Sequence, residues 1–158
     1  MGNIFSGSEI AEIGIQIEKN GRDFYNELAK KITDKKIQEI LQYLAAQEEK
    51  HIAMFQGILR DVENYQPAES YPGEYFAYMS ALAGDCVFTQ KNTGAEAAGS
   101  IKNTADAIDK AIGFEKDSIV FYSSAKKIVP LDGQKIVDEL ILQEQSHLQQ
   151  LLGIKTSL

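Results

Sequence analysis

Apolar residues recur at spacings of three and four along most of this chain, and this periodicity predicts α-helices. Four long segments carry the pattern: residues 8–31, 33–61, 103–128 and 132–153. Thr33 and Asp34 are start signals for the second segment. Pro130 and Gly153 are expected to end the third and the fourth. The chain lacks β-branched clusters bounded by turn dipeptides, so we predict an all-α fold without a sheet.

A long connection separates two helix pairs, 8–61 and 103–153. Spanning a helix of ~37 Å takes only about a dozen extended residues, so the crossover at 62–102 must hold structure of its own. The stretch GEYFAYMSALAGD at 73–85 predicts a short amphipathic helix there. We therefore expect one domain over residues 1–158, a four-helix bundle built from two helix pairs.

The two helix pairs repeat one sequence pattern. Four pairs of residues occupy equivalent positions: Glu18 and Glu115, Tyr25 and Tyr122, Glu48 and Glu144, His51 and His147. The first two pairs are 97 residues apart (115 − 18 = 122 − 25), and the last two are 96 apart (144 − 48 = 147 − 51). Each half thus has a glutamate with a tyrosine seven residues later, followed by Glu-x-x-His. The chain has only two histidines, and both lie in this motif.

The repeated glutamates and histidines fall on the apolar stripe that each helix should turn toward the core. Several carboxylates buried together without cations would be very unstable, and the stripes carry no Lys or Arg near them. Two divalent ions would balance the charge, and carboxylate with imidazole suits iron or manganese. We therefore predict a dinuclear site with six ligands: Glu18, Glu48, His51, Glu115, Glu144 and His147. Glu48 and Glu144 are expected to bridge the ions, with one remaining glutamate and histidine from each repeat completing each ion.

Small residues flank the terminal glutamates, and they have two interpretations. They are Gly14 and Gly21 around Glu18, and Ala111 and Ser118 around Glu115. They would leave room for an exogenous ligand such as peroxide or dioxygen. They would equally permit close approach of neighbouring helices.

Two pairs of polar residues stand close to the expected ligands in sequence. Tyr25 and Tyr122 would hydrogen-bond the terminal glutamates from two turns away and tune the site. Alternatively they are amphipathic core tyrosines whose hydroxyls find another partner. Gln47 and Gln143 precede each histidine by four residues and are candidates to orient it.

Composition narrows the class of protein further. A net charge of −7 argues against a nucleic-acid surface, and no apolar run is long enough to suggest a membrane span. A single cysteine excludes an internal disulfide framework and suits the cytoplasm. It also excludes a four-thiolate rubredoxin module within this chain. We find no case for haem or flavin.

The segments IEKNGRDFYNELAKKITDKKIQEILQYLAAQEEKH (17–51) and FEKDSIVFY with LQEQSH (within 114–147) resemble rubrerythrins of the ferritin-like di-iron carboxylate superfamily. The resemblance implies an antiparallel helix pair, a long crossover, a second pair and commonly a homodimer. It also implies oxidation of a diferrous centre by hydrogen peroxide or dioxygen, with Glu18 and Glu115 shifting coordination. Rubrerythrins carry a further carboxylate where this chain has Ser118. Their rubredoxin domain is absent from this chain, so electrons would come from a separate rubredoxin-like donor protein.

Three hypotheses for function follow. The first is an enzyme, a non-haem di-iron or di-manganese oxidoreductase that reduces peroxide or dioxygen in oxidative-stress defence. The second is a ferritin-like ferroxidase or iron-storage protein without peroxidase turnover. The third is a helical scaffold that metal merely stabilises.

Overall fold

The computed structural model describes residues 7–62, 78–79, 81–82, 93–127 and 129–158. Five α-helices are defined within these ranges: α1 (Gly7–Lys31), α2 (Lys35–Val62), α4 (Gly94–Gly99), α5 (Thr104–Ala125) and α6 (Leu131–Ser157). The part of the chain that is described contains no β-strand. The predicted all-α class is therefore confirmed.

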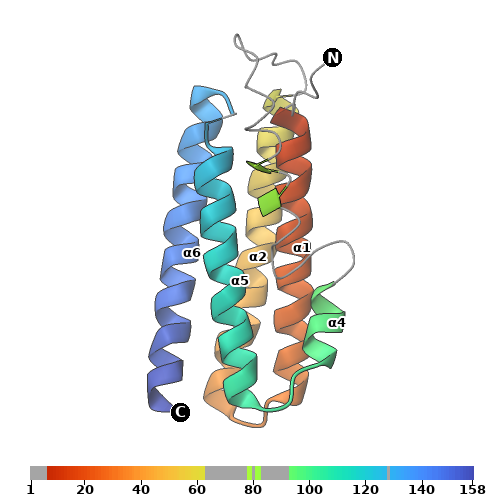
Figure 1. Ribbon diagram of the computed structural model, residues 1–158, viewed down its shortest axis with the longest axis vertical. Helices are drawn as coiled ribbons and strands as arrows, with labels where there is room; N and C mark the ends of the chain where they lie inside the picture. The colour runs from red at the N-terminus through yellow and green to blue at the C-terminus, as the bar shows by residue number, and fades with distance from the viewer. Residues whose placement is uncertain (1–6, 63–77, 80, 83–92, 128) are drawn as a thin grey trace.

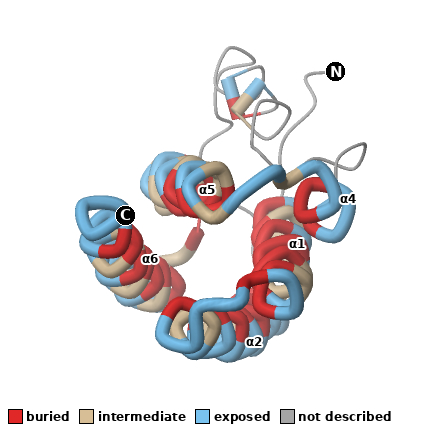
Figure 2. Tube along the Cα trace, turned by 90° about the horizontal axis from the view of Figure 1, so that it is seen from below, coloured by how far each residue is buried: buried red, intermediate tan, exposed pale blue. Residues whose placement is uncertain are grey.

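The four long helices form a bundle in which every neighbour is antiparallel (Figure 1). Helix α1 packs on α2 and α5 packs on α6, which gives the two predicted helix pairs. Contacts between α2 and α6 and between α1 and α5 close the bundle. Seen along the bundle axis in Figure 2, the helices follow one another in the order α1, α2, α6, α5. The two repeats therefore face each other across a common interior.

Polar side chains fix where two of the helices begin. Oδ1 of Asp34 accepts a hydrogen bond from the backbone N–H of Ile37 at 3.0 Å, at the start of α2. Oδ1 of Asn103 accepts from the backbone N–H of Asp106 at 2.9 Å, at the start of α5. These bonds satisfy N–H groups that have no partner inside the first turn of a helix.

The predicted ends of the third and fourth helices were wrong by a few residues. Helix α5 ends at Ala125, not at residue 128, because proline disfavours helical backbone in the residue before it, and Pro130 follows closely. Helix α6 continues past Gly153 to Ser157. No described glycine has a positive φ, so Gly153 does not form a left-handed cap. Burial of Ile154 in the core holds the last turn in place.

The crossover contains a helix that the sequence pattern did not predict. Helix α4 packs along α1 (Figure 1) and begins with a capping box between Thr93 and Glu96. A Cβ added to Gly94 would lie 1.8 Å from the carbonyl oxygen of Asn20, so this close packing requires glycine. The short helix predicted over 73–85 lies largely outside the described residues, although 78–79 and 81–82 within it are helical.

The buried residues of the four long helices face the interior of the bundle (Figure 2), and most of them belong to the predicted apolar stripes. Large side chains such as Phe24, Leu41, Phe55 and Leu140 are at most 2% exposed. Their burial supplies the main driving force for folding. A band of glutamate, histidine and tyrosine lies within the same interior, so the polar cluster is enclosed by the helices that position it.

Candidate metal centre

All six predicted ligand residues are buried in the middle of the bundle. None has more than 2% of its surface exposed: Glu18 on α1, Glu48 and His51 on α2, Glu115 on α5, Glu144 and His147 on α6. A spacing of three residues places the glutamate and histidine of each Glu-x-x-His on the same face of its helix. The sequence therefore folds locally so that both functional groups of each motif point inward together.

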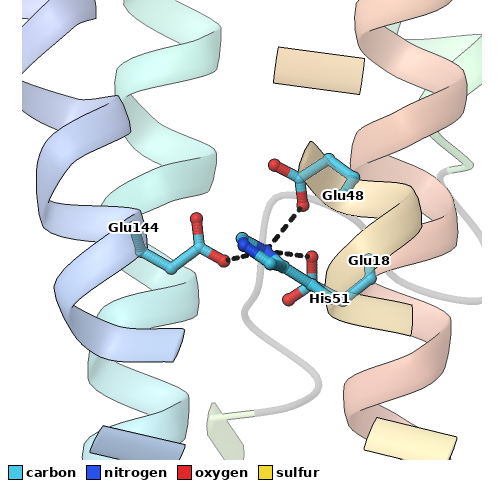
Figure 3. A group of neighbouring side chains, drawn as sticks. All are labelled: Glu18, Glu48, His51 and Glu144. Atoms are coloured by element: carbon cyan, nitrogen blue, oxygen red, sulfur yellow. Dashed lines mark hydrogen bonds and ion pairs between the residues drawn. The ribbon is translucent and has the colours of Figure 1, made fainter. Parts of the chain in front are cut away.

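The six side chains form two overlapping groups. One comprises Glu18, Glu48, His51 and Glu144, and the other comprises Glu48, Glu115, Glu144 and His147. Within each group, one potential ligand atom per residue lies within 4.8 Å of those of the other residues. Figure 3 shows the first group, with side chains from α1, α2 and α6 converging. Only Glu48 and Glu144 belong to both groups, which is the arrangement expected of bridging carboxylates.

Both imidazoles turn Nδ1 toward the carboxylates. Nδ1 of His51 lies 3.2 Å from Oε2 of Glu18 and 3.0 Å from Oε1 of Glu144. Nδ1 of His147 lies 3.0 Å from Oε2 of Glu144. The two rings stack with centroids 5.4 Å apart and planes inclined by 17°. Nδ1 is thus the nitrogen that each histidine offers to a metal.

Several buried oxygens of the cluster have no hydrogen-bond partner among the described residues. They include both carboxylate oxygens of Glu48 and Oε2 of Glu115. Buried polar atoms are normally satisfied, because an unmade hydrogen bond costs about 1–3 kcal/mol. Carboxylate oxygens that lack donors and face imidazole nitrogens suit a pair of divalent cations. The residues present therefore fit a dinuclear metal site.

Burial and mutual repulsion shift the pKa values of the clustered carboxyl groups in the metal-free protein. Burial, followed by the charges of Glu18 and Glu144, raises the pKa of Glu48 well above its usual range. Burial and the charge of Glu144 do the same to the pKa of Glu115. Glu144 behaves differently. Burial acts to raise its pKa, but the imidazoles of His147 and His51 outweigh this effect and lower it.

The histidines hold protons more tightly than usual in the absence of metal. Burial acts to lower both pKa values, but the neighbouring carboxylates outweigh burial. Glu144, Glu18 and Glu48 raise the pKa of His51 far above 6.5. Glu115 and Glu144 raise that of His147 to about 9. Metal ions must therefore displace these protons in order to bind.

The two tyrosines contact the glutamates of the opposite repeat. Oη of Tyr25 donates a hydrogen bond to Oε1 of Glu115 at 2.5 Å, and Oη of Tyr122 donates to Oε1 of Glu18. Each tyrosine therefore hydrogen-bonds a terminal glutamate, as predicted, but that glutamate belongs to the other repeat and is not the one two turns away. Seven residues span about 10.5 Å along a helix, whereas the antiparallel packing of α1 and α5 sets each tyrosine level with the other repeat's glutamate.

The tyrosine hydroxyls keep their protons. Burial, followed by the charge of the accepting glutamate, raises the pKa of Tyr25 and of Tyr122 well above 10. Both phenols are thus fixed hydrogen-bond donors. They restrain Glu18 and Glu115, the two glutamates that were predicted to change their coordination.

One of the two glutamines contacts a histidine, and it is the histidine of the other repeat. Oε1 of Gln143 lies 3.0 Å from Nε2 of His51. Gln47 instead accepts from Nζ of Lys50 at 3.5 Å. The expectation that each glutamine orients the histidine four residues later was therefore wrong, because α2 and α6 are antiparallel and bring the two motifs face to face. Glu139, which was not predicted as part of the site, accepts a hydrogen bond from Nε2 of Gln143 at 3.4 Å.

Aromatic side chains from neighbouring helices occupy the space beside the two glycines that flank Glu18. A Cβ at Gly14 would meet the ring of Phe55 at 2.5 Å, and one at Gly21 would meet the ring of Phe114 at 2.4 Å. These glycines therefore serve close packing of the helices and do not leave a space for a ligand. On the other repeat, the hydroxyl of Ser118 is buried and has no hydrogen-bond partner among the described residues.

The fold and this set of side chains define the class of the protein. An antiparallel bundle with one glutamate on each of two helices, and Glu-x-x-His on each of the other two, is typical of ferritin-like di-iron carboxylate proteins. The Rubrerythrin family model matches residues 9–155. The chain is also similar to a candidate ferritin-like diiron-carboxylate protein from Thermotoga maritima. The TM-score is 0.74 and the identity 30%, and the match covers 99% of this chain and 98% of that chain. This chain belongs to the rubrerythrin family.

Two further findings complete the comparison. Among curated proteins, none matches the chain at a significant level. None of the helices in the described ranges combines the length and apolarity needed to cross a bilayer.

Proposed function

We propose that this protein is a non-haem di-iron oxidoreductase that reduces hydrogen peroxide or dioxygen, with manganese as the alternative metal. The observation that carries the proposal is the duplicated set of six buried side chains, in which both carboxylate oxygens of Glu48 and one of Glu115 lack hydrogen-bond donors. We place the protein in oxidative-stress defence in the cytoplasm, as a homodimer that receives electrons from a separate rubredoxin-like donor. Membership of the rubrerythrin family supports this assignment.

Six side chains would hold the metal ions. Glu48 and Glu144 lie where they would bridge, Glu18 and His51 would complete one position, and the remaining glutamate and histidine the other. When bound, two ferrous ions supply two electrons, which with two protons reduce one molecule of hydrogen peroxide to two of water.

The chain's own residues control access and protons at this site. Surrounding aromatic side chains such as Phe55 and Phe114 exclude water from the cluster. Tyr25 and Tyr122 hold protons at Oη next to the terminal glutamates. Glu18 and Glu115 are the proposed catalytic carboxylates. Each accepts a hydrogen bond from the tyrosine of the opposite repeat, which orients it.

Replacing each tyrosine singly by phenylalanine tests its role. In Tyr25→Phe and in Tyr122→Phe, the glutamate that accepted the hydrogen bond loses its donor, while the ring that fills the core remains. We expect each variant to bind the same amount of iron but to be oxidised by peroxide about tenfold more slowly, the lower end for loss of an outer-shell contact. Stopped-flow absorbance of the iron-loaded protein measures this rate. An unchanged oxidation rate in both variants would show that the tyrosines serve only to pack the core.

The proposed function is tested by single-turnover oxidation. The protein is loaded anaerobically with Fe(II) and mixed with peroxide or with dioxygen, with the same iron in buffer as a control. We expect peroxide to be consumed at about one molecule per two irons, and repeatedly when a reductant is supplied. Iron that is oxidised once and then accumulates in a large assembly would instead support iron storage. No oxidation by either oxidant would leave only a metal-stabilised scaffold.

A further inference from the structure

The two histidines differ in the surroundings of Nε2, the ring nitrogen that points away from the carboxylates. Nδ1 of His51 faces the carboxylates, and its Nε2 lies 3.0 Å from Oε1 of Gln143. An amide oxygen can only accept a hydrogen bond, so Nε2 must carry the proton. In neutral His51 the lone pair is then on Nδ1, where a metal needs it.

A second contact fixes the orientation of the glutamine. Nε2 of Gln143 donates to Oε1 of Glu139 at 3.4 Å. A carboxylate accepts but does not donate, so the amide must point its nitrogen to Glu139 and its oxygen to His51. Glu139, Gln143 and His51 therefore form a polar chain that leads from the surface of α6 to the ligand on α2.

The equivalent positions of the first repeat do not form such a chain. Gln47 is equivalent to Gln143 and Tyr43 to Glu139 (143 − 47 = 139 − 43 = 96). Gln47 pairs with a lysine, and the ring of Tyr43 lies edge-on to His147 with centroids 6.5 Å apart. The polar contacts of His147 with described glutamates are all made by Nδ1. Its side chain is 3% exposed, against 0% for His51.

We propose that Gln143, oriented by Glu139, is a positioning residue that makes the two metal positions unequal. The ion held by Glu18 and His51 binds more tightly than the ion held by Glu115 and His147. This inference rests on the proposed six-ligand site and adds an order of filling to it. Loss of an outer partner of a metal-binding histidine typically weakens metal affinity by about 10–100-fold, so a difference of this size is expected between the positions.

Anaerobic titration of the metal-free protein with Co(II), followed by its visible absorbance, tests the inference. We expect two steps in the native protein, with the tighter step lost in His51→Ala. Gln143→Leu should weaken the tighter step by about 10–100-fold, whereas the mirror-image control Gln47→Leu leaves both steps unchanged. Glu139→Ala should shift the tighter step in the same direction by less. Gln143→Glu keeps a hydrogen-bond acceptor for Nε2 of His51, so this variant should retain the affinity of the tighter step.

A purely structural role for Gln143 predicts different results. It would lower the unfolding temperature of metal-free Gln143→Leu and would not be rescued by glutamate. Two equal steps in the native protein, or equal effects of Gln143→Leu and Gln47→Leu, would overturn the inference while leaving the six-ligand site intact. Failure of the native protein to bind Co(II) at all would overturn the proposed function and the inference together.

Discussion

We expect Glu48→Ala to abolish binding of both metal ions, because Glu48 is one of the two residues that belong to both ligand groups. The measurement is iron per chain after anaerobic loading with excess Fe(II) and removal of unbound metal. We expect about two irons in the native protein and close to none in the variant. The matched control is Glu49→Ala. Glu49 is the next residue on α2, but its side chain is 61% exposed and pairs with Arg22 at the surface.

His51→Ala separates the bridging role from the terminal one. His51 belongs to only one group, so its loss should remove about one iron and leave the ion at His147. Two irons retained by Glu48→Ala would show that Glu48 does not bridge. An equal loss in Glu49→Ala would show that the iron was held by surface carboxylates.

We expect the metal-free protein to lose stability as the pH rises from 6.5 to 9. The pKa of His147 is 6.5 in the unfolded chain and about 9 in the folded protein. Folding thus stabilises the protonated form, and this contribution is complete below 6.5 and lost as the pH passes 9. One pKa unit corresponds to ~1.4 kcal/mol, so the loss is roughly 3 kcal/mol, or about 6–12 °C in Tm for a chain of this size.

The other titratable groups of the cluster either lower stability in the same way as the pH rises or act outside the range from pH 6.5 to 9. The raised pKa values of His51, Glu48 and Glu115 also favour the protonated folded state. The lowered pKa of Glu144 matters only below about pH 4.5, where that contribution is lost as the pH falls.

Thermal unfolding with and without metal measures the effect. Bound ions replace the protons, so the Tm of the loaded protein should stay level or rise over the same pH range. Metal-free His147→Gln is the control, and its Tm should depend less on pH than that of the native protein. A native metal-free Tm that stays constant from pH 6.5 to 9 would show that the cluster does not hold these protons.

The bundle and the six buried residues at its centre could be predicted from the sequence alone. Apolar spacing of three and four fixes which face of a helix is buried, and the duplicated glutamates and histidines lie on that face. A buried carboxylate needs a cation or a proton, so placing several of them together already predicted a metal site. These conclusions depend on local periodicity and charge, which a linear pattern contains. The family match over residues 9–155 agrees with them.

Contacts between side chains on different helices could not be predicted from the sequence. Helices α1 and α5 run in opposite directions, so residues at one level have numbers with a constant sum (18 + 122 = 25 + 115 = 140). This register pairs Tyr25 with Glu115 and not with its own Glu18. The contact of Gln143 with His51 arises in the same way across α2 and α6. Sequence periodicity places a residue on a face of its own helix, but partners on other helices depend on how the helices pack.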